Sequence, residues 1–264
     1  FRMSDGGEIS RKEVPPASQW LGAVETRLIC AAVMGEQTVY SLFDVLQGKT
    51  VWSLARKNST RAQIIDQDEL ALFDGESGLF TVHALTTGET RLEVKLTPDP
   101  ELHRLLAFRS ASQYLVLPSK SSLMPKGAAM PFGAMPGIGK YSEFVDGTAH
   151  GIDRQKGQVI WSKQVSRMAT LPQPNLSLPV WIFVGQFLEQ DKTLKIVRSG
   201  YRSLVLDTRN GEELFAERDL NESLMPQEIA VDLKRKRLEL RFHRTMLRLD
   251  YDDPSVKEPD PTRN

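Results

Sequence analysis

The chain has 264 residues, and its 34 Lys and Arg residues are balanced by 34 Asp and Glu residues, so its formal net charge is zero. Nucleic-acid-binding domains usually carry an excess of positive charge, and this balance therefore argues against a nucleic-acid partner. The longest apolar runs, such as 179–184, fall far short of the roughly 20 residues that a membrane-spanning helix needs, so no membrane span is predicted.

The start of the chain bears on its origin, and its single cysteine limits the disulfides and metal sites that it can form. The chain opens on Phe1, without an initiator Met and without the charged-then-apolar pattern of a signal peptide, which indicates a fragment or a processed product. Residues 1–18 are expected to be flexible. Because Cys30 is the only cysteine, an intramolecular disulfide and a zinc site built on several cysteines are both excluded. The apolar run around Cys30 predicts an inert, buried thiol.

Apolar and polar residues alternate with a period of two along much of the chain, which is typical of β-strands. Short aliphatic and β-branched runs bounded by Gly, Asp, Asn or Pro include "TVYSLF", "GLFTVHAL", "YLVLP" and "SLVLD". In the clearest case, 229–242, the charged run 234–237 separates two alternating segments and predicts a β-hairpin with a solvated turn. Helical periodicity is almost absent, so an all-β fold of many short strands is predicted.

One template occurs four times, as "DVLQGKTVW" (44–52), "ALTTGETRL" (84–92), "DRQKGQVIW" (153–161) and "DTRNGEELF" (207–215). An Asp, or Ala84 in the second copy, opens the template. A Gly follows after three intervening residues, and a large apolar residue stands four positions after the Gly. A weaker fifth copy spans 247–256, where Pro254 takes the place of the Gly. A strand is expected before and after each copy.

The template predicts a tight turn between two strands. The Asp side chain bonds the amides of its own turn, and the Gly supplies a positive φ. The large apolar residue lies on the outgoing strand, where burial between neighbouring sheets contributes on the order of 2–3 kcal/mol. Since the Asp recurs once per unit, an architectural role is predicted for it and not a catalytic one. The predicted structural positions are Asp44, Gly48, Trp52, Gly88, Asp153, Gly157, Trp161, Asp207, Gly211 and Phe215.

The spacing of the copies predicts the blades of a β-propeller. Successive copies are close to the roughly 40–50 residues of a four-stranded blade, except for the longer step from Ala84 to Asp153. That step requires an insertion, predicted as a loop near 118–143, which is rich in Ser, Gly, Pro and Met. About five four-stranded blades, forming a propeller or part of one, are predicted within 19–252. A disordered tail is predicted at 253–264.

The segments "GIDRQKGQVIW" (151–161), "VLDTRNGEELF" (205–215) and "SLFDVLQGKTVW" (41–52) resemble the repeat of PQQ-like, quinoprotein-type and WD-like β-propellers. The resemblance covers most of 20–252. It implies the C-terminal part of a larger bacterial repeat protein, and it slightly favours the cell envelope or periplasm. In quinoproteins of this family, the cofactor sits on calcium, often against two adjacent cysteines. This chain has one cysteine and no evident calcium cluster, so no cofactor is predicted.

Other patterns that suggest chemistry are weak. The glycine-rich stretch 130–142 lacks the residues of a phosphate-binding loop, because Tyr141 stands where Ser or Thr is needed and Ala134 stands at the first Gly position. No Gly-x-Ser-x-Gly motif occurs. No local pair at metal-ligand spacing is formed by His83, His103, His150 and His243. No catalytic, cofactor-binding or metal-binding residue is predicted.

The predicted function is a non-catalytic binding or scaffolding module that contacts a protein partner through the loops of a rigid ring. A quinone-dependent oxidoreductase domain is the alternative, and a carbohydrate-binding propeller with exposed aromatic side chains is a further one. Trp20 and Trp181 stand outside the repeat and could serve in the last case, although burial in the core is the favoured interpretation of both. The fold alone does not decide among these functions.

Overall fold

The computed structural model describes residues 18–120, 143–170, 179–191, 196–219, 228–232, 234–241 and 246–250. In these ranges the chain forms β-strands and no helix. It follows that no described helix has the length and apolar character needed to cross a membrane. The chain divides into two compact units, one formed by 1–124 with 146–165 and the other by 125–145 with 166–264.

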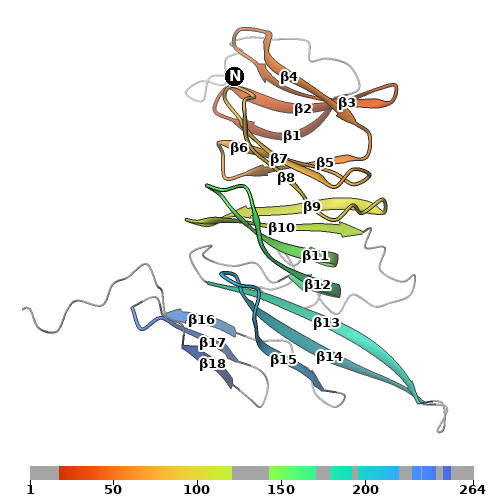
Figure 1. Ribbon diagram of the computed structural model, residues 1–264, viewed down its shortest axis with the longest axis vertical. Coiled ribbons are helices and arrows are strands. Elements are labelled where there is room, and N and C mark those ends of the chain that lie inside the picture. The colour runs from red at the N-terminus through yellow and green to blue at the C-terminus, as the bar shows by residue number, and fades with distance from the viewer. Residues whose placement is uncertain are drawn as a thin grey trace, which may run out of the picture. The chain divides into compact units, whose positions relative to one another are not determined.

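The first unit is built from sheets whose strands are antiparallel neighbours in chain order (Figure 1). The first sheet consists of β1 (Ser18–Val24), β2 (Arg27–Met34), β3 (Gln37–Asp44) and β4 (Lys49–Lys57). The second consists of β5 (Thr60–Ile65), β6 (Glu69–Asp74), β7 (Leu79–Ala84) and β8 (Thr90–Lys95). The third is the part of a seven-stranded sheet that lies in this unit, and it contains β9 (Leu102–Arg109), β10 (Gln113–Lys120), most of β11 (Glu143–Asp153) and the first part of β12 (Val159–Thr170).

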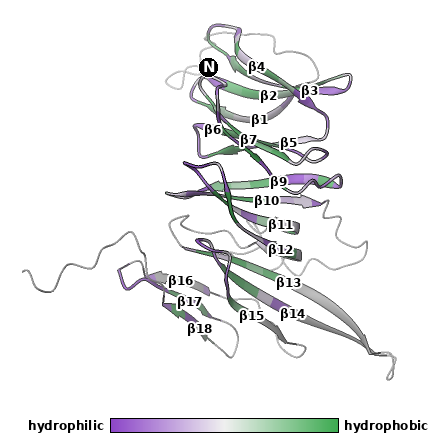
Figure 2. Ribbon diagram, viewed as in Figure 1, coloured by the Kyte–Doolittle hydropathy of each residue, from purple (hydrophilic) through white to green (hydrophobic). Residues whose placement is uncertain are grey.

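Two apolar layers hold these three sheets face to face. The layer between the first and second sheets includes Ile29, Leu42, Leu70 and Leu72. The layer between the second and third sheets includes Phe73, Phe80, Tyr114, Val116 and Ile152. Successive side chains of a strand point to opposite faces, so β6 supplies both layers with its central apolar residues 70–73 (Figure 2). Both β6 and β7 are buried almost throughout.

Four-stranded antiparallel sheets that stack in chain order through apolar layers are the blades of a β-propeller-type fold. The prediction of an all-β, propeller-type fold is therefore confirmed. The predicted insertion near 118–143 begins and ends in strands, because Pro118 belongs to β10 and Glu143 opens β11. Residues 121–142 of it, and with them the glycine-rich stretch 130–142, lie outside the described residues.

In the second unit, the end of β12 pairs with β13 (Val180–Asp191), which is followed by β14 (Ile196–Asp207) and β15 (Glu213–Asp219). Trp181 is 1% exposed, its Nε1 donates to Thr170 Oγ1 at 2.8 Å, and its ring centroid lies 5.0 Å from that of Phe183. The favoured interpretation of Trp181 as a core residue is thus correct.

A three-stranded sheet of β16 (Glu228–Asp232), β17 (Arg237–Arg241) and β18 (Met246–Asp250) completes the second unit. The predicted hairpin at 229–242 corresponds to β16 and β17, with Leu240 opposite Ile229. The turn is shorter than predicted, because Arg237 already belongs to β17, where its Nε lies 2.6 Å from Asp250 Oδ1.

Trp20 corrects one expectation, because its side chain is 50% exposed and not buried. It lies on β1, an edge strand of the first sheet, beside a register shift between Trp20 and Gly22. Its neighbour Leu21 packs against the layer between the first and second sheets. Trp20 lies opposite Cys30 of β2, and the neighbour of Cys30, Ile29, belongs to that layer, so Trp20 points away from it.

Candidate functional site

The segment that connects the second sheet to the third is fixed in place by the turn between β6 and β7. Leu96 N–H donates to Gly78 O at 2.8 Å, and Asp99 N–H donates to Gly75 O at 2.8 Å. Gly78 has a φ of 74°, and a Cβ on it would overlap the Leu96 carbonyl oxygen. Only glycine combines this conformation with so close an approach, so the turn holds residues 96–101 beside the third sheet.

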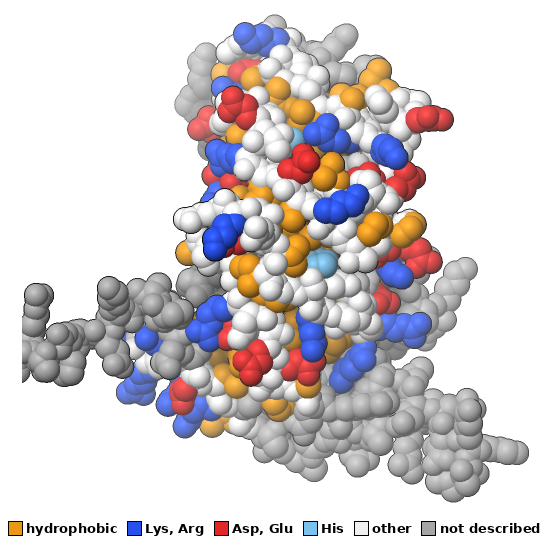
Figure 3. Space-filling model, viewed as in Figure 1, with side chains coloured by type: hydrophobic (Ala, Val, Ile, Leu, Met, Phe, Trp, Pro, Cys, Tyr) orange, Lys and Arg blue, Asp and Glu red, His pale blue; other side chains and the backbone are white. Residues whose placement is uncertain are grey.

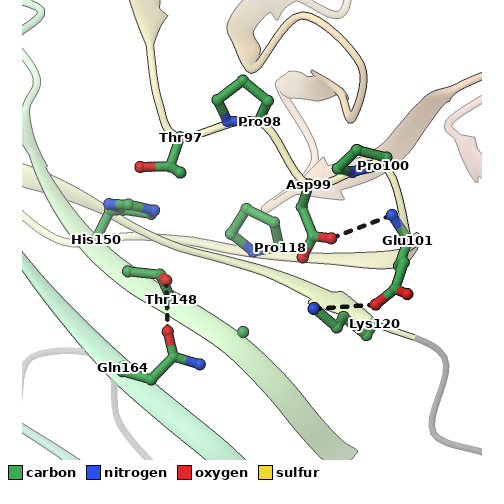
Figure 4. A pocket seen from close by; sticks show the side chains of 11 residues that line it. Thr97, Pro98, Asp99, Pro100, Glu101, Pro118, Lys120, Thr148, His150 and Gln164 are labelled. Carbon is green, nitrogen blue, oxygen red and sulfur yellow. Dashed lines mark hydrogen bonds and ion pairs between the residues drawn. The ribbon is translucent and has the colours of Figure 1, made fainter.

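A cavity of about 540 Å³ lies between this connecting segment and the third sheet. Residues 97–101 form one wall, and side chains of β10, β11 and β12 form the other (Figure 4). Gly147 allows the close approach of β11 to β10 here, because a Cβ on it would overlap the carbonyl oxygen of Pro118. The cavity thus brings together parts of the chain that are about 50 residues apart.

The charged and polar side chains of the cavity form short local pairs. Lys120 Nζ lies 3.0 Å from Glu101 Oε2, and this ion pair raises the pKa of Lys120. Asp99 Oδ1 accepts the backbone N–H of Glu101 at 3.2 Å. On the opposite wall, Thr148 Oγ1 donates to Gln164 Oε1 at 2.9 Å. The cavity is therefore polar on both sides (Figure 4).

His150 on β11 is the buried titratable group of the cavity, with only 3% of its surface exposed. Its Nδ1 lies 2.8 Å from Ser162 Oγ on the neighbouring β12. Burial removes the imidazole from water, which disfavours the charged form and lowers the pKa of His150 to about 4. The ring is therefore neutral at pH 7 and offers hydrogen-bonding atoms without a charge.

The low pKa of His150 predicts that the protein loses stability in mild acid. Histidine in the unfolded chain titrates near 6.5, whereas His150 in the folded chain has a pKa of about 4. Between these values the unfolded state binds a proton that the folded state does not. The free energy of unfolding should therefore fall as the pH drops, by about 2 kcal/mol from this residue at pH 5 relative to pH 7.5.

Urea unfolding at pH 7.5 and pH 5 measures this effect. His150→Gln should reduce the difference between the two pH values, whereas His103→Gln, on an exposed position of β9, should leave it as in the wild type. Burial lowers the pKa of His83 as well, so a smaller difference should persist in the His150 variant. A difference unaffected by His150→Gln would contradict the prediction.

A second group of titratable side chains surrounds Glu69, whose exposed fraction is only 1%. Tyr114 Oη donates to both of its carboxylate oxygens, at 2.9 Å and 3.0 Å. Arg91 lies 2.9 Å from Oε1 and Arg109 lies 3.4 Å from Oε2. Side chains of β8, β9 and β10 thus bond the carboxylate. Since β8 belongs to the second sheet and β9 and β10 to the third, these bonds connect the two sheets.

The surroundings of Arg109 extend this cluster. Its guanidinium lies 2.6 Å from Asp66 Oδ2 and 2.8 Å from Asp68 Oδ2, and the bond to Asp68 is the main reason that its pKa is raised. Arg154 lies over the ring of Tyr114, 5.4 Å from its centroid. Because positive and negative groups are matched and bonded to one another, the cluster fits a structural role between two blades.

The repeat residues lie in turns of one geometry. Asp44 Oδ1 accepts the N–H of Gln47 at 2.8 Å, and Asp153 Oδ1 accepts those of Gln155 and Lys156 at 2.8 Å. Asp207 Oδ1 accepts the N–H of Arg209 at 2.8 Å. The glycines all have positive φ, between 63° and 77°, at Gly48, Gly88, Gly157 and Gly211. These turns join β3 to β4, β7 to β8, β11 to β12 and β14 to β15, and none of their template residues lines the cavity.

The aromatic residues of the repeat differ in their surroundings. Trp52 packs against Gly88 in the second sheet's turn, and its Nε1 donates to Leu85 O at 2.7 Å. Trp161 is 7% exposed and lies across Gly151 of β11. Phe215 on β15 is half-buried. Of these contacts, that of Trp52 connects one sheet to the next.

One turn of the same kind has no counterpart among the predicted copies. Asp74 Oδ1 accepts the N–H of Glu76 at 3.3 Å, and Gly78, four positions after Asp74, has positive φ. The sequence carries the Asp and Gly at the repeat spacing, but Val82 stands where the large apolar residue was required. A search for Asp and Gly alone could have found this turn, which holds the cavity wall.

The remaining candidates from the sequence are structural or lie outside the described residues. His83 is buried, with its Nε2 3.0 Å from Thr81 Oγ1, and His243 lies outside the described residues. Cys30 is buried, as predicted. Across the described ranges, no three His, Cys, Asp or Glu side chains converge as metal ligands would. His150 is hydrogen-bonded to Ser162, and its place in the cavity has no signal in the sequence.

No protein-family model and no curated protein matches this sequence. Among solved structures, the chain is similar to Kuenenia stuttgartiensis hydrazine synthase, with 13% identity over 81% of this chain and 70% of that one, at a TM-score of 0.31. It is also similar to Myxococcus xanthus glutaminyl cyclase, with 9% identity over 82% of this chain and 81% of that one, at a TM-score of 0.33. Likenesses this distant carry no information on activity, so function must be argued from the residues themselves.

Proposed function

We propose that the chain is a non-catalytic PQQ-like β-propeller module of a larger bacterial protein, and that it binds a protein partner. The proposed propeller spans 19–252 and carries the insertion near 118–143, with 1–18 and 253–264 outside it. The proposed binding site is the cavity beside residues 97–101. The observation that supports the proposal is this cavity, where polar side chains gather outside the apolar layers of the core.

The distribution of charge on the surface of the first unit favours binding at one local site. It does not favour binding through a broad region of one charge. In the view of Figure 3, basic and acidic side chains are interspersed over the first unit, with apolar side chains between them. Such a mixed surface gives little long-range attraction for a highly charged partner. Recognition then depends on what a partner inserts into the cavity, as with the anchor residues of many protein interfaces.

Site-specific photo-crosslinking in cells that produce the protein tests the proposal. A photoreactive amino acid at Thr97, an exposed residue of the cavity wall, should give a covalent adduct with a partner, heavier than the 29.7 kDa chain. The same amino acid at Thr50, an exposed threonine on β4, should give none. Adducts of equal yield at both positions, or none at Thr97, would count against a binding site at the cavity.

The quinone-dependent oxidoreductase remains the alternative of a different class. A thermal melt with pyrroloquinoline quinone and calcium separates the two functions. A ligand present at about a hundred times its dissociation constant stabilises a fold by roughly 2.7 kcal/mol, so a cofactor site would raise the melting temperature visibly. An unchanged melting temperature is expected if the module is non-catalytic.

The exposure of Trp20 favours the carbohydrate-binding alternative as a second candidate function. Its side chain is 50% exposed on the edge strand β1, and exposed tryptophans stack on sugar rings. Affinity electrophoresis in gels that contain soluble polysaccharides measures such binding. Retardation of the wild type that is lost in Trp20→Ala would support this function, and equal migration of both proteins would reject it.

A further inference from the structure

The charges on the cavity wall do not cancel. Asp99, Glu101 and Lys120 line the cavity, and Lys120 is already paired with Glu101 at 3.0 Å. Asp99 accepts one backbone N–H, from Glu101 at 3.2 Å, and no cationic side chain of the described residues pairs with its carboxylate. With His150 neutral, the wall carries one net negative charge, which Asp99 and Glu101 share because both act on Lys120. Such a site attracts a cationic group and repels an anion.

His150 adds an uncharged hydrogen-bonding atom to the same cavity. Its ring is 3% exposed, and Nδ1 is occupied by Ser162 Oγ at 2.8 Å. Within the described residues, no group bonds to Nε2, so this nitrogen is left for a ligand. When Nδ1–H donates to Ser162 Oγ, Nε2 is an acceptor, and it is not among the buried side-chain atoms that lack a partner. Figure 4 shows the ring facing Thr97 across the cavity.

Rigid apolar groups surround these polar atoms. Pro98, Pro100 and Pro118 all line the cavity, and in Figure 4 Pro118 lies between His150 and Asp99, while Pro98 lies beside Thr97 and Pro100 beside Glu101. Proline rings have few accessible conformations, so such walls lose little entropy when a ligand is bound. They suit the aliphatic stem of a long side chain whose charged end reaches the carboxylate.

We propose that the cavity receives an arginine side chain of the protein partner, with its guanidinium on the Asp99 carboxylate. This inference rests on the proposed protein-binding function and names what the site recognises. A guanidinium presents several N–H donors in one plane and can bond a carboxylate in a bidentate manner. The prolines that line the cavity can contact the methylene stem.

Binding of N-acetyl-arginine amide, followed by NMR titration of the whole chain, tests the chemistry directly. N-acetyl-citrulline amide has nearly the same shape without the charge and should bind at least about tenfold more weakly, since a charge-assisted bond is lost. Asp99→Asn should weaken binding of the arginine probe by a similar factor. The asparagine keeps a side-chain oxygen that can accept the Glu101 N–H. Glu76→Gln, at an exposed acid paired with Lys57, is the matched control and should change nothing.

A variant that is expected to strengthen binding distinguishes the loss of a specific contact from a general loss of folding. Lys120→Met leaves the cavity with two negative charges and should tighten binding of the arginine probe severalfold. Equal binding of the arginine and citrulline probes, unchanged binding in Asp99→Asn, or weaker binding in Lys120→Met would each overturn the proposal. So would the absence of any binding by the arginine probe.

The same variants distinguish this inference from the proposed function. If Thr97 crosslinks to a partner in Asp99→Asn as well as in the wild type, the protein-binding function stands and the arginine inference fails. If the probe binds as expected but Thr97 gives no adduct in cells, the cavity recognises a guanidinium and the protein-binding function fails. Loss of the adduct in Asp99→Asn, with retention in Glu76→Gln, supports both.

Discussion

Replacement of Glu69 by alanine is expected to destabilise the fold by about 3 kcal/mol, because it removes a buried carboxylate that bonds Tyr114 and two partly exposed arginines. The carboxylate is 1% exposed and accepts the Tyr114 hydroxyl at 2.9 Å and 3.0 Å, with Arg91 at 2.9 Å. Without it, the hydroxyl of Tyr114 is left in a buried place with no acceptor. Urea unfolding at pH 7.5 measures the loss.

Two further variants identify the cause of that loss. A double-mutant cycle with Tyr114→Phe should show a coupling energy of about 1–3 kcal/mol, as expected for two groups in direct contact within one network. Glu76→Gln is the control, because the ion pair of Glu76 with Lys57 is exposed and is expected to contribute no more than about 1 kcal/mol. If Glu69→Ala costs no more than this control, the cluster does not hold the two blades together.

Replacement of Phe73 by alanine is expected to cost about 3–5 kcal/mol through loss of apolar contact and the cavity left behind. Phe73 is 0% exposed and lies opposite Phe80 on the next strand, in the layer between the second and third sheets. Thermal unfolding should show a melting temperature lower by about 10 °C, since about 2–4 °C is lost per kcal/mol in a domain of this size.

Comparison with a milder and a neutral substitution makes the Phe73 result specific. Phe73→Leu keeps most of the buried volume and should cost about 1 kcal/mol. Leu46→Ala, at a turn residue that is 55% exposed, should change the free energy of unfolding by less than about 0.5 kcal/mol. Similar losses in Phe73→Ala and Leu46→Ala would mean that the layer contributes little to stability.

The fold could be predicted because its signals are local in sequence. Alternating residues and turn residues are read within a few positions, and β16 and β17 lie where the pattern at 229–242 predicted them. Trp20 shows the limit of such signals. Burial was the favoured interpretation of Trp20, but the face on which a strand residue falls depends on register, and the register shift at Trp20 is not visible in the sequence.

The cavity and the Glu69 cluster could not be predicted from one sequence. Glu69, Arg91 and Tyr114 are more than 20 residues apart along the chain and meet only because two sheets stack. Asp99 and His150 come together in the same way. Their residue types alone indicate nothing, because an isolated Asp, Glu or His is most often a solvated or structural side chain.

The composition of the first unit from two separate stretches, 1–124 and 146–165, has a consequence for its synthesis. A ribosome delivers the chain from its N-terminus, so the first two sheets can be complete before residue 146 emerges. The third sheet then still lacks most of β11 and the start of β12, and Ile152 is missing from its apolar layer. Until residue 165 has emerged from the ribosome, β10 therefore lacks its full pairing with β11, an interval in which a chaperone can bind this open edge.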